Sequence, residues 1–235
     1  MHALFAAMRG APDIEALWRI LSAYFSERGI TRLTAVHLPP AGVPDDEPAL
    51  VHIQGYPKEW IAGYLKRRKH DPIPVHVRNH PTPFRWAEIG KLRKLTPEQK
   101  ELLAYCKSID VINGVAIPVF GPNGRNGYIG IGLSEDQDDI SDAQLGEYQI
   151  VAQIAHQRLC EMMAPSDCER IKLSPRQKEI LEWVARGKSN TSIAEILGIS
   201  ADTVDTHLRR TYDKLDVTDR VRAAIRGIGC GLIDP

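Results

Sequence analysis

Apolar residues recur at helical spacing in several stretches of the first two thirds of the chain. After Asp13, the residues Leu17, Leu21 and Phe25 fall on one face, and Gly29 ends the pattern, which predicts a helix. Thr96 precedes a proline and stands three residues before a glutamine, which is typical of a capped helix start. Further helices are predicted over residues 58–67, 75–78, 97–108 and 141–163.

Shorter apolar runs between these helices predict strands. Two lie at residues 33–38 and 50–53, separated by a proline-rich loop at 39–48. The clearest hairpin joins 114–120 to 127–133 through the turn sequence GPNGRN. Strands and helices do not alternate as in a doubly wound sheet. The order therefore predicts an α+β fold, an α-β-α sandwich with an antiparallel sheet.

The last part of the chain has a different pattern, with helices only. Ser174 is expected to cap a first helix that Gly187 ends, and Gly198 provides a tight turn after a second. Ser200 is expected to cap a third helix, and a fourth is predicted from about Asp219. We therefore expect a small all-α helix-turn-helix domain over 173–235, following a polar linker at 164–172 and an N-terminal domain over 1–163.

The third of these helices is expected to present a polar, partly basic face. Arginine can bind guanine, aspartate can accept from cytosine, and threonine can contact thymine in the major groove. The outward residues are Thr203, Asp205, Thr206, Arg209 and Arg210, and Lys188 is expected to contact phosphate. Charge alone gives no such indication, since residues 173–235 hold ten Lys and Arg against nine Asp and Glu. The alternative is a helical dimerisation or docking module.

This segment resembles the LuxR-type helix-turn-helix, which response regulators of the FixJ/NarL group share. The matching residues are LSPRQKE at 173–179, GK at 187–188, IA at 193–194, LGIS at 197–200, TV at 203–204, HL at 207–208 and KL at 214–215. The resemblance implies that Val204, Leu208 and Leu215 pack inward while positions 205, 206 and 209 face bases. The family often has lysine where this chain has Asp205, so the operator sequence does not carry over.

Residues 1–160 resemble the autoinducer-binding domain of quorum-sensing LuxR proteins. The match consists of Gly55-Tyr56-Pro57, Trp60, Tyr64, Asp71-Pro72, Pro83 to Trp86, Gly114, Ile117-Pro118 and Gly124, in this order. The resemblance implies an acyl-homoserine lactone as ligand. Trp60 would donate to the lactone carbonyl, Asp71 would accept from the amide N–H, and Tyr56 would donate to the acyl carbonyl. Tyr64 and Trp86 would line the pocket.

Simpler interpretations remain for these residues. Each aromatic side chain can be an ordinary core residue, and Asp71 before a proline can be a turn or cap residue. The segment between Tyr64 and Asp71 is about two residues shorter than in relatives. Many relatives also carry serine or threonine where this chain has Gly130. A glycine there is expected to leave room for a branched or aromatic acyl group, unless it serves only the twist of the strand.

The composition of the chain and the motifs it lacks argue against several other classes of protein. The chain has 235 residues and a formal net charge of zero, so only a local patch can attract DNA. The four cysteines are scattered and are expected to be reduced thiols, and no metal site is expected from His70, His76 and His80. No signal sequence, membrane span, phosphate loop or nucleophile motif is recognisable. We therefore expect a cytoplasmic protein that is not an enzyme and has no cofactor.

Together these patterns predict a quorum-sensing transcription regulator. It would bind an acyl-homoserine lactone and, as a homodimer, a double-stranded DNA operator, with the helix at 141–163 as the dimer seam. One alternative keeps the DNA-binding module but gives the sensor another small molecule, or none. A second alternative is an enzyme that acts on acyl lactones, which the missing nucleophile and metal motifs disfavour.

Overall fold

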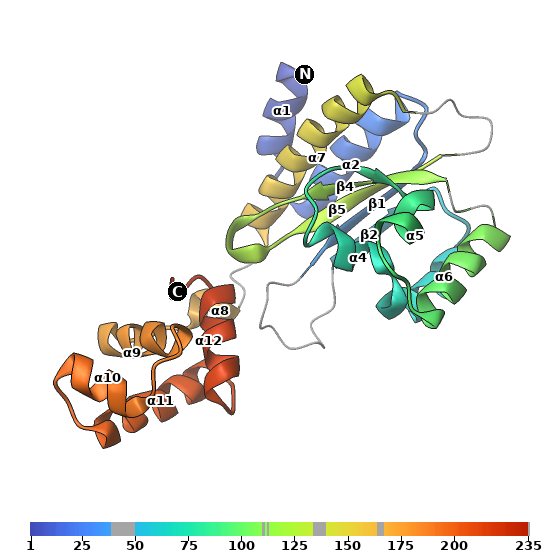
Figure 1. The fold of residues 1–235 in the computed structure, drawn as a ribbon. Helices are drawn as coiled ribbons and strands as arrows, with labels where there is room; N and C mark the ends of the chain where they lie inside the picture. Colours follow the sequence, from blue (N-terminus) through green and yellow to red (C-terminus); the bar gives the residue numbers. More distant parts are fainter. Residues whose placement is uncertain (39–49, 110, 112, 134–139, 164–166, 235) are drawn as a thin grey trace. The chain divides into compact units, whose positions relative to one another are not determined.

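A computed structural model describes residues 1–38, 50–109, 111, 113–133, 140–163 and 167–234. Its contacts divide the chain into two units, one made by residues 1–38 and 50–162 and the other containing Met163 and residues 167–234 (Figure 1). The loop predicted at 39–48 lies outside the described residues.

An antiparallel five-stranded sheet in the order β2-β1-β5-β4-β3 forms the centre of the first unit (Figure 1). Its strands are β1 (Arg32–His37), β2 (Leu50–Gln54), β3 (Phe84–Arg85), β4 (Gly114–Val119) and β5 (Gly127–Gly132). Every residue of β4 and β5 is buried, because helices cover both faces of the sheet. The predicted α-β-α sandwich and its hairpin are therefore confirmed.

The helices of this unit form two groups. Helices α1 (His2–Arg9), α2 (Ile14–Ser26) and α7 (Asp142–Met162) lie on one face of the sheet (Figure 1). On the other face are α3 (Lys58–Arg67), α4 (Pro72–Val77), α5 (Ile89–Leu92) and α6 (Pro97–Ser108), with 3-10 turns η1 (Arg68–His70) and η2 (Trp86–Glu88) between them. A third such turn, η3 (Pro122–Gly124), lies in the β4–β5 connection. Among the described residues, no helix has the length and hydropathy needed to cross a bilayer.

Two of the helix starts predicted in this unit are capped, and the helices α1 and α5 were not predicted. Asp13 accepts a hydrogen bond from the backbone of Ala16, and Thr96 forms a capping box with Gln99. Helix α1 was missed because an eight-residue helix is marginal alone and its sequence carries no cap signal. It is held by packing on α2 and α7, with Met8 completely buried.

The second unit contains four helices that match the predicted helix-turn-helix. They are α9 (Pro175–Ala185), α10 (Asn190–Leu197), α11 (Ala201–Leu215) and α12 (Arg220–Gly229). Ser174 and Ser200 cap α9 and α11 as predicted, and Gly198 ends α10 in the left-handed region. Ile180, Ile193 and Leu215 are fully buried between the helices.

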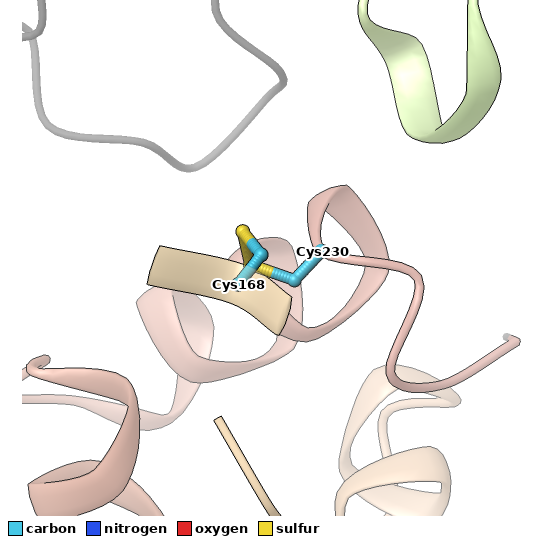
Figure 2. The surroundings of a disulfide bond; sticks show 2 residues. All are labelled: Cys168 and Cys230. Atoms are coloured by element: carbon cyan, nitrogen blue, oxygen red, sulfur yellow. A yellow bond between two sulfur atoms is a disulfide. The ribbon is translucent and has the colours of Figure 1, made fainter. Parts of the chain in front are cut away.

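The segment predicted as a polar linker contains further structure. A short helix, α8 (Asp167–Arg170), carries Cys168, which forms a disulfide with Cys230 directly after α12 (Figure 2). The expectation of four reduced thiols was therefore wrong for this pair. The two residues are 62 positions apart, and the packing of the helical unit brings them together without any motif in the sequence. Cys106 and Cys160 are free thiols.

Candidate ligand cavity and DNA-contacting helix

A cavity lies between the sheet and the helices α3, α4 and α6. Sites for small organic ligands are typically apolar with a few polar groups, and this cavity has that character. The lining is mainly apolar and aromatic. It consists of Thr34, Tyr56, Trp60, Tyr64, Asp71, Ile73, Trp86, Leu102, Leu103, Cys106, Val111 and Tyr128.

Three aromatic rings form one wall of the cavity. Trp60 and Tyr64 lie one turn apart on α3, so the helix places their rings above one another, and Tyr56 stands two residues before the helix begins. The ring centroids of Tyr56 and Trp60 are 4.4 Å apart, and those of Trp60 and Tyr64 are 4.9 Å apart. The structure thus brings together the aromatic residues that the sequence placed at the site.

Asp71 divides its two carboxylate oxygens between two roles. Oδ1 accepts a 2.9 Å hydrogen bond from the backbone of Ile73 and caps α4. Oδ2 accepts hydrogen bonds from the hydroxyls of Tyr64 at 2.7 Å and Tyr128 at 3.3 Å. The cap interpretation is thus correct for one oxygen, while the other oxygen takes part in a polar cluster beside the cavity. Burial raises the pKa of the Asp71 carboxyl, and these hydrogen bonds oppose the shift only in part.

Three buried polar atoms in this region have no hydrogen-bond partner among the described residues. They are the hydroxyl of Tyr56 and the indole nitrogens of Trp60 and Trp86. A buried donor without a hydrogen-bond partner lowers the stability of a protein by about 1–3 kcal/mol. Such atoms are therefore rare in the hydrophobic cores of native proteins. Three of them around one cavity fit an occupant that carries hydrogen-bond acceptors.

The room expected at Gly130 is occupied by a neighbouring side chain. Thr34 lies directly opposite Gly130 in the β1–β5 ladder. A Cβ at position 130 would overlap the Thr34 hydroxyl and lie 3.2 Å from the Trp86 ring. Thr34 lines the cavity, and Gly130 is not among the lining residues. Thr34 therefore fills the space that a side chain at position 130 would occupy. The sequence alone does not show this, because it depends on the register between β1 and β5.

Tyr128 was also missed by the sequence analysis, although a signal for it existed. Residues two apart on a strand point to the same face, so Tyr128 shares the face of Gly130 on β5. The indole of Trp86 reaches the same region because it packs against Gly114, where a Cβ would overlap the ring.

The proposed recognition helix, α11, shows two distinct faces. Val204, Leu208 and Leu215 are buried in the helical unit. The residues expected to face DNA lie on the surface: Thr203, Thr206, Arg209 and Arg210 are exposed and Asp205 is half-buried. Lys188 is exposed between α9 and α10.

Two of the candidate base-reading residues pair with each other. The Arg209 Nε lies 2.9 Å from a carboxylate oxygen of Asp205, one helical turn before it. The Arg209 side chain is 78% exposed, and exposed ion pairs contribute little to stability. Arg209 can therefore leave this pair for another acceptor at low cost.

The fold and the two candidate sites define a class of protein, a regulator that joins a small-molecule domain to a helix-turn-helix DNA-binding domain. The family model for the autoinducer binding domain matches residues 13–159, and that for the bacterial regulatory proteins of the luxR family matches residues 172–226. The chain belongs to the LuxR family of quorum-sensing transcription regulators, which are not enzymes.

Individual relatives agree with this assignment. The chain is 31% identical to the quorum sensing-dependent transcriptional regulator RpaR of Rhodopseudomonas palustris, over 82% of this chain and 80% of RpaR. It is 27% identical to the transcriptional activator LuxR of Aliivibrio fischeri, over 77% of this chain and 74% of that protein. A crystal structure of Escherichia coli SdiA matches with a TM-score of 0.74 at 20% identity, covering 100% of this chain and 98% of SdiA, which shows a shared fold.

Proposed function

We propose that the signal molecule of this regulator is an acyl-homoserine lactone. Such a ligand carries two carbonyl acceptors, one amide donor and an apolar chain. The observation that carries the proposal is the set of unpartnered buried atoms on Tyr56, Trp60 and Trp86 beside the acceptor oxygen of Asp71.

Each polar group of the ligand then has a partner. Trp60 donates to the lactone carbonyl, Tyr56 donates to the acyl carbonyl, and Asp71 accepts from the amide. Tyr64 and Trp86 contact the apolar parts of the ligand, and Thr34 adds a hydroxyl from β1. The roles of these residues follow from the family resemblance and are consistent with the geometry.

The test compares two ligands that share an acyl chain. Binding of N-octanoyl-homoserine lactone and of 1-octanoylglycerol to the purified full-length protein is measured by calorimetry. The second compound is chosen because an SdiA structure contains octanoyl-rac-glycerol. We expect the lactone to bind more tightly, because its amide N–H and lactone carbonyl match Asp71 and Trp60 together, whereas the glycerol ester has neither group. Tighter binding of the glycerol ester would overturn the proposed signal class.

A matched pair of variants locates the binding site. Tyr56→Phe removes the unpartnered hydroxyl and is expected to weaken binding of the lactone several-fold. Tyr148→Phe makes the same change on α7, outside the cavity lining, and is expected to leave the affinity unchanged. Equal affinities of the two variants would remove Tyr56 from the site.

We further propose that residues 1–163 bind the signal and dimerise, and that residues 173–235 bind an operator as a pair. Both units expose apolar side chains in the single chain, namely Ile150 on α7 and Val221, Ile225 and Ile228 on α12. A dimer presents two copies of α11 to half-sites about one helical turn apart, which favours an operator with two-fold symmetry. Analytical ultracentrifugation and footprinting test this, and a monomer bound to a single asymmetric site would contradict it.

A further inference from the structure

The sheet of the first unit has a cluster of buried donor atoms on the face away from the ligand cavity. His37 ends β1, while His156 and Cys160 are one turn apart on α7. Thr34 on β1 lines the cavity, and side chains of a strand alternate, so His37 points to the opposite face. His37 is more than a hundred positions away from His156 and Cys160 in sequence, and all three residues are buried. The proposed signal-binding role of the first unit makes no use of them.

The distances within the cluster match those between ligands of one ion. One ligand atom from each residue lies within 4.8 Å of the other two, and the sulfur of Cys160 is 3.5 Å from Nε2 of His156. Bonds of about 2.0–2.3 Å to a metal place its ligands roughly 3.3–4 Å apart. The His156–Cys160 pair already has this spacing, and a shift of about 1 Å brings the His37 ring nitrogen into range.

A second observation points to an occupant. Nδ1 of His37 is buried and has no hydrogen-bond partner among the described residues. His37 is only 4% exposed, so water does not satisfy this nitrogen from the surface. Nε2 of His156 donates a 2.7 Å hydrogen bond to the carbonyl oxygen of Arg125, and a metal ion would replace this hydrogen bond. The same carbonyl oxygen lies 3.9 Å from the sulfur of Cys160.

We propose that His37, His156 and Cys160 bind one thiophilic transition-metal ion, Cu⁺ or Zn²⁺. Two imidazoles and a thiolate are ligands that both ions accept, and a nearby backbone carbonyl is a recurrent weak ligand of His₂Cys copper sites. Binding transfers the thiol proton of Cys160 to solvent and forms the sulfur–metal bond. The ion ties α7 to the end of β1 and to the turn before β5.

The burial of all three ligands favours the monovalent ion. Cu⁺ with one thiolate has no net charge, whereas Zn²⁺ with one thiolate keeps one positive charge, which is costly to bury. Burial also lowers the pKa of both imidazoles, that of His37 to about 4, so both rings are in the neutral form that binds metals.

The experiment uses the full chain after treatment with a chelator, under argon. Co²⁺ serves as the probe for the zinc arm, because a thiolate ligand gives it a charge-transfer band in the near ultraviolet. In the copper arm, Cu⁺ is withdrawn from a chromophoric chelator by the protein. We expect one ion per chain in both arms, a tighter site for Cu⁺, and a higher melting temperature with the ion bound.

Two cysteine variants decide the result. Cys160→Ala is expected to lose the sulfur band, the stoichiometric binding and the thermal shift. Cys106→Ala removes the other free thiol and is expected to keep all three. Circular dichroism of both variants without metal verifies their folding, and His37→Asn provides a second variant if Cys160→Ala does not fold. Absence of binding by the wild type in both arms, or binding that survives Cys160→Ala and His37→Asn, would overturn the proposal.

Discussion

The hydroxyl of Tyr64 donates a 2.7 Å hydrogen bond to Oδ2 of Asp71, and Tyr128 approaches the same oxygen from β5. This oxygen is the proposed acceptor for the ligand amide. A bound ligand therefore joins an existing hydrogen-bond cluster, and the position of the acceptor is fixed before the ligand arrives. The other oxygen of Asp71 holds the start of α4.

Asp71→Asn is expected to weaken binding of the acyl-homoserine lactone by about tenfold or more, because a hydrogen bond to a charged group contributes roughly 1.5–3 kcal/mol. Asparagine also caps helices, so α4 should persist. Calorimetry with the purified variant measures the loss. Asp13→Asn, at the cap of α2, is the matched control and should bind like the wild type. Unchanged affinity of Asp71→Asn would restrict Asp71 to its capping role.

The same variant has a predictable effect on stability. The pKa of Asp71 is raised in the folded state, so the carboxyl favours folding while it is protonated and loses this contribution as the pH rises from about 4 through the folded pKa. Asparagine does not titrate. The free energy of unfolding of Asp71→Asn, relative to that of the wild type, should therefore increase with pH over this range, as urea unfolding at a series of pH values would measure.

The main expected effect of Gly130→Ser is a loss of stability, and not a change in which acyl groups the protein binds. The new Cβ overlaps the Thr34 hydroxyl, and overpacking typically costs about 1–3 kcal/mol. Thr34→Ala in the same chain should remove most of this cost. A double-mutant cycle by urea unfolding measures the coupling between the two positions. Additive effects would show that the two side chains do not compete for the same space.

Arg209→Ala is expected to weaken specific operator binding by about 1–3 kcal/mol if its guanidinium reads a guanine. Loss of its exposed pair with Asp205 should leave the stability of the helical unit nearly unchanged. Arg19→Ala removes one exposed arginine from α2 and controls for the change of net charge. Fluorescence anisotropy with operator DNA measures both variants, and equal affinities would exclude Arg209 from base contact.

Lys188→Ala is expected to act on all DNA sequences alike. A phosphate contact releases about 0.9 counterions, so its loss lowers the slope of log K against log salt by about one. Titrations of operator and unrelated DNA at several salt concentrations measure this slope. A selective loss of operator binding would instead indicate that Lys188 contacts a base.

Reduction of the Cys168–Cys230 disulfide is expected to lower the melting temperature of the helical unit. A bridge between distant residues typically contributes about 2–4 kcal/mol by restricting the unfolded chain. Cys168→Ser should melt at the lower temperature with or without dithiothreitol, and Cys106→Ser should respond to the reductant like the wild type. Identical melting of the oxidised and reduced wild type would show that the bridge carries no stability.

The sequence by itself determined the local elements and the two-part order of the chain. Capping residues such as Thr96, Ser174 and Ser200 and the glycine turn at Gly198 identify their helix ends because caps act within one helical turn. The four-residue spacing of Trp60 and Tyr64 within α3 likewise suffices to stack these two rings, whereas Tyr56 joins them from the segment before the helix. The main error among the helices is the missed α1. Its sequence carries no local signal, because packing on other helices stabilises it.

Only the tertiary structure decided which distant residues meet. Strand register places Thr34 opposite Gly130, and helix packing joins Cys168 to Cys230. The same holds for His37 and Cys160, which approach each other only because α7 lies on the sheet. Such contacts depend on how complete elements pack, and a one-residue shift in register would exchange the two faces of β1. A sequence pattern shows which residues share a face of a helix or strand. It does not show which distant element packs against that face.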